Sequence, residues 1–142
     1  HISAKHLSQL GVNGTLINHA EKPVSINEIE KSVGLCRKYN LTSVVCANNT
    51  EKIKEIVKIC KPDYIAYEPP ELIGGKLSVT DAKPETIKKS IEAAKGVKIL
   101  CGAGIHSRND LDIALKLGTS GVLISSHIVK AINPLKALKE LL

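Results

Sequence analysis

The stretch LTSVVCANNTEKIKEIVKICKPDYIAY (residues 41–67) places a short apolar segment on each side of a charged, helix-like one. Segments 41–47 and 64–67 are nearly continuous runs of hydrophobic residues, which is typical of strands that are covered on both faces. Residues 50–60, between them, carry apolar residues at helical spacing. Strand, helix and strand in this order predict a parallel βαβ unit.

The same alternation extends over the whole chain. Pro84 suits the first position of a helix, and Ser107 and Pro134 are start signals for two more. Ser25 and Glu28 form a capping box ahead of a helix that reaches about Tyr39. Five βα units in an α/β fold with a parallel sheet are therefore expected, with strands at 14–18, 41–47, 64–67, 98–102 and 121–125.

Two architectures accommodate five such units. One is an open, doubly wound sheet. The other is part of an eight-stranded (β/α)8 barrel, which needs roughly 200 to 250 residues, so that a chain of 142 residues would lack about three N-terminal units. The first segment is a helix pattern without a preceding strand, which favours the partial barrel. In either case residues 1–142 are expected to form a single domain.

Composition narrows the possible partners. Hydrophobic residues make up 43% of the chain, charged residues 24%, and the net charge is +6. The lysines are spread over several helix patterns, so we interpret them as solvated helix faces and expect no nucleic-acid partner. No apolar run of 18 residues is present and no signal peptide is recognisable, so we expect no membrane association and a cytoplasmic location. None of the four cysteines forms a CxxC pair, which predicts buried free thiols and no zinc site.

The residues that follow the predicted strands are the most informative. One strand ends at His19, another at Glu68, and two end in small residues that include Gly104, Ser125 and Ser126. The carboxyl ends of parallel strands meet at one edge of the sheet, where ligands bind in both architectures. Small residues there let backbone amides approach an anion such as phosphate. His19 and Glu68 facing such a site would suit an electrophile and a base.

The remaining histidines have no comparable setting. We interpret His1, His6, His106 and His127 as surface residues. A structural role for His19, or a plain tight turn at Gly102–Gly104, is the simpler alternative for each motif taken alone. It is their combination at several strand ends that points to a site.

Four motifs resemble the triosephosphate isomerase family in its archaeal form: GTLINHAEK (14–22), YIAYEPPELIG (64–74), ILCGAGI (99–105) and GVLISS (121–126). They cover essentially the whole chain in the family's order. The resemblance implies a TIM barrel and the interconversion of dihydroxyacetone phosphate and glyceraldehyde 3-phosphate, without a cofactor or a metal. It also implies a homo-oligomer, a dimer or a tetramer, in the complete protein.

The resemblance also implies roles for individual residues. Glu68 would be the general base and His19 the neutral electrophile, a pair whose tuning in this enzyme is well known. The stretch after Glu68 would be a lid, with Pro69-Pro70 as its stiff end. Substrate phosphate would be bound by the backbone amides of Ile73, Gly74, Gly104, Ser125 and Ser126.

Three departures from the family pattern qualify these expectations. Ala20 stands where the family usually has serine, and Lys76 replaces a glycine of the lid. The family's lysine and asparagine from the first strand end have no counterpart, so we expect at most trace activity from this chain alone. Two alternatives stay open: another phosphate-binding barrel, such as a phosphoribosyl isomerase or prenyl-glyceryl phosphate synthase, and a truncated, non-catalytic homologue. The pairing of HAE with YEPPELIGG argues against the former.

Overall fold

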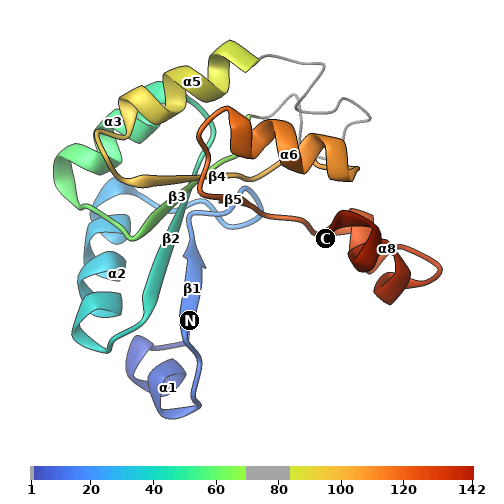
Figure 1. Cartoon of the computed structure of the whole chain (residues 1–142). Coiled ribbons are helices and arrows are strands. Elements are labelled where there is room, and N and C mark those ends of the chain that lie inside the picture. Colours follow the sequence, from blue (N-terminus) through green and yellow to red (C-terminus); the bar gives the residue numbers. More distant parts are fainter. Residues whose placement is uncertain (1, 70–83) are drawn as a thin grey trace.

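A computed structural model describes residues 2–69 and 84–142. Their strands form one five-stranded, entirely parallel sheet in the order β1-β2-β3-β4-β5 (Figure 1). Each strand lies next to the one that follows it in the sequence, as in a barrel and unlike a doubly wound sheet. The fold is therefore a partial TIM barrel. The strands are β1 (Gly14–Ile17), β2 (Thr42–Ala47), β3 (Tyr64–Tyr67), β4 (Lys98–Cys101) and β5 (Gly121–Val122).

The helices alternate with the strands as predicted. Figure 1 shows α2, α3 and α5 along one face of the sheet, while α8 packs on α6 and α7 beyond β5. The helices of the described residues are α1 (Ala4–Gln9), α2 (Ile26–Lys38), α3 (Thr50–Ile59), α5 (Pro84–Ala93), α6 (Arg108–Lys116), α7 (Ser126–Val129) and α8 (Pro134–Leu141).

Local signals set the ends of these helices. Ser25 and Glu28 make the predicted capping box, in which Ser25 Oγ accepts from Glu28 N while Glu28 Oε2 accepts from Ser25 N. Ser107 caps α6 by accepting from Asp110 N. Gly118, with φ of +102°, follows the end of α6, because a glycine adopts this backbone conformation without a side-chain clash.

The fifth strand is shorter than the predicted 121–125. Only Gly121 and Val122 pair with β4, and Leu123 N adds one more hydrogen bond, to Cys101 O. In the described part of the chain β5 is an edge strand, so its last residues have a neighbour on one side only. The chain turns into α7 directly after Ser125.

The core between sheet and helices is aliphatic, as the scarcity of aromatic residues predicts. Ile65 and Val45 from the sheet are fully buried against Ile53 and Ile56 of α3. All four cysteines are buried and free, which confirms their predicted state. Within residues 2–69 and 84–142, no helix has both the length and the apolar character that crossing a bilayer requires.

Candidate functional site

The predicted strand-end residues come together at the carboxyl edge of the sheet. A cavity of about 300 Å³ opens there, between the ends of β1, β3, β4 and β5. His19 and Glu68 lie on one side of the cavity, and Gly104, Ser125 and Ser126 lie on the other. The parallel register of the sheet produces this arrangement, because every strand delivers its following residues to the same edge.

The side chains of His19 and Glu68, which follow β1 and β3, approach each other at the cavity. His19 Nε2 lies 4.0 Å from Glu68 Oε1. The Glu68 side chain is only 8% exposed, whereas that of His19 is 40% exposed. A buried carboxylate therefore lies close to a partly exposed imidazole at the cavity.

The backbone around Glu68 is fixed on both sides. Glu68 N donates to Ala47 O at 2.8 Å, and Gly102 N donates to Tyr67 O at 2.9 Å. Gly102 also gives the side chain its space, since a Cβ at this position would lie 2.4 Å from Glu68 Cγ. Gly102 was predicted from the sequence only as part of a turn near phosphate, and its second requirement, room for Glu68, was not predicted.

Asn18 is a positioning residue that the sequence analysis did not single out. Its φ of +62° lies in the left-handed region, which asparagine tolerates better than most residues. Its Nδ2 donates to Cys46 O at 2.9 Å, and its Oδ1 accepts from Val24 N at 3.0 Å. Asn18 thus ties the end of β1 to β2 and to the loop before α2, and so determines the direction in which His19 leaves the strand.

A backbone contact selects the tautomer of His19. Nδ1 accepts a hydrogen bond from Glu21 N at 3.3 Å. In the neutral ring the proton then resides on Nε2, the atom that faces Glu68. A neutral His19 consequently presents an N–H donor to the cavity. The Glu21 carboxylate is 91% exposed and lies 3.9 Å from Nδ1, which suits a supporting role.

Burial raises the pKa of Glu68 above its ordinary value. A positive charge on His19 and the thiol of Cys46 act in the opposite direction and offset part of this shift. Burial, together with the nearby Glu68 charge, raises the pKa of Cys46 to about 12. Cys46 therefore remains a thiol at neutral pH and can donate to the carboxylate.

The other side of the cavity is suited to an anion. Gly104 has a φ of +74°, and α7 begins at Ser126 with no side-chain cap. Within the described residues, the backbone amides of Gly104, Ser125 and Ser126 make no hydrogen bond to a protein acceptor. Unpaired amides at the edge of a parallel sheet can bind the oxygens of a phosphate group.

The interpretation of His106 and His127 as surface residues is wrong. Both are half-buried and line the cavity, with ring centroids 6.2 Å apart and ring planes at 65°. His106 Nε2 is buried and has no hydrogen-bond partner among the described residues. The β4–α6 loop and α7 meet at this edge, so the residues next to the GAG and SS motifs also face inward. His6 is exposed, as expected.

Several predicted residues lie outside the described part of the chain. These are His1 and the lid residues Pro70, Ile73, Gly74 and Lys76. In residues 2–69 and 84–142, no group of three or more metal-ligating side chains is close enough to hold an ion.

Replacement of Glu68 by glutamine should stabilise the protein at neutral pH. Because the folded-state pKa of Glu68 is raised, the charged carboxylate costs folding free energy, and this cost is complete only above that folded-state pKa. The cost disappears below the unfolded-state value of about 4.3. Urea unfolding from pH 4 to pH 8 should therefore show that Glu68→Gln gains stability as the pH rises. An equal gain at every pH would contradict burial of the charge as its cause.

Gly102→Ala should displace the Glu68 side chain. The added methyl group would occupy the position next to Glu68 Cγ, so the carboxylate must leave its place opposite His19. The chemical shift of a ¹³C-labelled Glu68 carboxyl group reports this movement. Gly34→Ala in α2 is the matched control, since no atom lies within 4 Å of its added Cβ, and it should leave that shift unchanged. An unaltered Glu68 resonance in Gly102→Ala would contradict the close packing.

Comparisons with known proteins give the family and the fold of the chain. The family model for triosephosphate isomerase matches residues 1–141. The triosephosphate isomerase of Methanosarcina acetivorans is 44% identical over all of this chain and 65% of its own length. That of Methanocaldococcus jannaschii is 43% identical over all of this chain and 66% of its own length. The chain thus spans about 65% of the length of these curated relatives.

Comparison with solved structures supports the fold of this chain and says nothing of its function. A tryptophan synthase α-subunit from Pyrococcus furiosus superposes with a TM-score of 0.73 at 18% identity, over 97% of this chain and 58% of that one. Thiamine phosphate pyrophosphorylase from Pyrococcus furiosus gives a TM-score of 0.65 at 18% identity, over 97% and 61%. Because the family model covers nearly the entire chain and the curated relatives align with it from end to end, the chain belongs to the triosephosphate isomerase family.

Proposed function

We propose that the protein is a triosephosphate isomerase that interconverts dihydroxyacetone phosphate and glyceraldehyde 3-phosphate. The observation that carries this proposal is the 4.0 Å approach of His19 Nε2 to Glu68 Oε1, beside a cavity lined by backbone amides that have no acceptor among residues 2–69 and 84–142. A base, an N–H donor and an anion-binding wall are three of the elements that the reaction needs. We further propose a cytoplasmic location and a homo-oligomer, with no cofactor and no metal.

The proposed reaction moves one proton between neighbouring carbon atoms. The Glu68 carboxylate removes a proton from the carbon next to the carbonyl, and the electrons of that C–H bond form the double bond of an enediolate. The carbonyl oxygen gains negative charge, which the Nε2–H of neutral His19 stabilises by donating a hydrogen bond. Protonated Glu68 then returns its proton to the adjacent carbon. His19 moves a different proton, that of the substrate hydroxyl, from one oxygen to the other.

Burial of Glu68 serves this chemistry. A carboxylate whose pKa is raised is a stronger base and comes closer to the proton affinity of the substrate carbon. The cavity also keeps the carboxylate away from bulk water, since its side chain is 8% exposed. The same burial thus favours proton abstraction and costs folding free energy.

The substrate phosphate would be bound on the opposite wall of the cavity. The amides of Gly104, Ser125 and Ser126 would donate to its oxygens, and those of Ile73 and Gly74, which lie outside the described residues, would complete the set on closure of the lid. These assignments rest on the positions of the strand ends and on the resemblance to the family.

The activity of this chain alone is a separate matter. The lysine that the resemblance places at the family's first strand end has no counterpart among the 142 residues. In the family, the positive charge of that lysine attracts the anionic substrate and stabilises the negatively charged intermediate. We therefore propose that the chain binds the reaction's intermediate mimic through Glu68 and His19 but has at most trace isomerase turnover.

Calorimetric binding of a phosphate-bearing enediolate mimic tests this proposal. The wild-type chain should bind the mimic, and Glu68→Ala and His19→Ala should each weaken binding by about 100-fold, because both residues contact the enediolate and not the phosphate. Glu21→Ala is the control, since this exposed residue borders the same cavity and should change affinity by less than about threefold. Circular dichroism verifies that each variant is folded.

Equal affinity of wild type, Glu68→Ala and His19→Ala would overturn the assigned roles and favour a phosphate-binding homologue without catalysis. A coupled isomerase assay on the same samples should show at most trace turnover. Near-normal turnover would contradict the requirement for the lysine but would leave the roles of Glu68 and His19 intact.

A further inference from the structure

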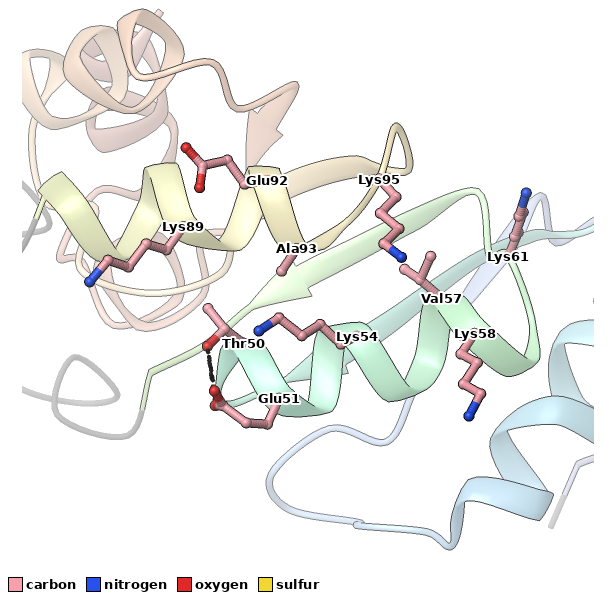
Figure 2. Close-up of a pocket in the computed structure, with 10 residues that line it drawn as sticks. All are labelled: Thr50, Glu51, Lys54, Val57, Lys58, Lys61, Lys89, Glu92, Ala93 and Lys95. Atoms are coloured by element: carbon pink, nitrogen blue, oxygen red, sulfur yellow. Dashed lines mark hydrogen bonds between the residues drawn. The ribbon is translucent and has the colours of Figure 1, made fainter.

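A second hollow of the described surface lies on the outer, helical side of the sheet. It is a groove of about 910 Å³ between α3 and α5, which contact each other (Figure 2). It is distinct from the cavity at the strand ends. Its floor includes the buried side chains of Val57 and Ala93, and its rim carries five lysines: Lys54, Lys58, Lys61, Lys89 and Lys95.

Charge is distributed unevenly around this groove. Figure 2 shows Lys54 and Lys95 extended over the gap between the two helices, whereas Lys58, Lys61 and the carboxylates of Glu51 and Glu92 point away from it. Glu51 is also engaged locally, because its oxygens accept from the Thr50 hydroxyl at 3.1 Å. The lining residues together carry an excess of three positive charges.

The groove lysines have no close carboxylate partner among the described residues, although the charge of Lys54 helps to lower the pKa of Glu51. Among the described residues, none of the five forms an ion pair. On the same two helices, outside the groove, Lys52 pairs with Glu55 at 2.9 Å and Lys88 pairs with Glu85 at 3.4 Å. α3 and α5 thus have paired lysines on one side and unpaired lysines around a concave surface, where like charges repel each other.

The backbone at Lys95 contributes to this concentration of charge. Lys95 has a φ of +47° in the turn after α5 and is followed by Gly96 at +91°. Few residues other than glycine, asparagine and aspartate adopt this conformation. A lysine there directs its ammonium group over Val57 instead of into solvent beyond the turn (Figure 2).

The chemistry of the lining residues restricts what could occupy the groove. Among the described residues that line it, none is aromatic, so nucleic-acid bases have no stacking surface. None is an arginine, so a protein partner would find no guanidinium group for bidentate hydrogen bonds. The apolar residues lie buried in the floor, so they offer such a partner no exposed apolar anchor. What remains is a set of point charges that suits a flexible, multiply charged anion.

We infer that the groove between α3 and α5 binds inorganic polyphosphate. Its ammonium groups would neutralise successive phosphates along the groove, and the affinity would come mainly from the release of counterions. The site is independent of the proposed isomerase reaction, which takes place at the strand ends and uses none of these lysines.

Two double variants test the inference with matched charge. Lys54→Gln/Lys89→Gln removes one groove lysine from each helix, and Lys52→Gln/Lys88→Gln removes one paired lysine from each helix outside the groove. Binding of fluorescent polyphosphate of narrow length distribution would be measured by anisotropy over a range of salt concentrations. Orthophosphate, and single-stranded RNA with the same number of phosphates, serve as comparison ligands.

The groove variant should bind polyphosphate about tenfold more weakly and lower the salt slope by roughly 1.4, since each phosphate contact contributes about 0.7. The control variant should change affinity by less than twofold. Equal losses in the two variants, or no saturable binding by wild type, would overturn the site. Tighter binding of the RNA would overturn the choice of ligand. Unchanged affinity of both variants for the enediolate mimic verifies an intact catalytic region, whatever the outcome for polyphosphate.

Discussion

The constraint on which the rest of the site depends is the burial of one carboxylate at the carboxyl edge of a parallel sheet. Glu68 leaves β3 into a space that exists only because Gly102, directly after the neighbouring strand β4, has no side chain. The Glu68 amide donates to Ala47 O of β2, and Tyr67 O, directly before Glu68, accepts from Gly102 N. Since β3 pairs over its whole length with β2 on one side and β4 on the other, Glu68 cannot shift along the edge. Its distance to His19, its raised pKa and its shielding from water all follow from this placement.

The scaffold offsets the cost of that burial away from the site. Ser43 N and Oγ both donate to Asp63 Oδ2, at 2.8 and 2.7 Å, which ties the loop before β3 to β2 at the opposite edge of the sheet. These hydrogen bonds, that of the Ser43 amide foremost, hold the pKa of Asp63 below its ordinary value. Asp63 therefore stabilises the fold above the unfolded-state pKa, and this contribution is lost as the pH falls through the folded one. Glu68 acts in the opposite sense. In its charged form Asp63 stabilises the fold, whereas the charged form of Glu68 destabilises it.

Much of this architecture follows from local rules in the sequence. The capping box at Ser25, the proline at the start of α8 and the nearly continuous apolar runs are each interpretable without tertiary information, and the elements they predict are present. The two strand-end residues His19 and Glu68 were predicted for the same reason, since parallel strands deliver their ends to one edge. The extent of β5 was less predictable, because the pairing of an edge strand depends on its neighbours.

What sequence reasoning missed depends on contacts between distant residues. Nothing near Gly102 in the sequence indicates that its missing side chain makes room for Glu68, 34 residues earlier. Asn18 acts through Cys46, and His106 meets His127 only because two loops converge. The most direct measurement of the central claim is a ¹³C titration of the Glu68 carboxyl group. Its midpoint should lie clearly above the ordinary glutamate value of about 4.3 and should rise further in Cys46→Ala, which removes the thiol that lowers it. A midpoint at or below 4.3 would contradict the account.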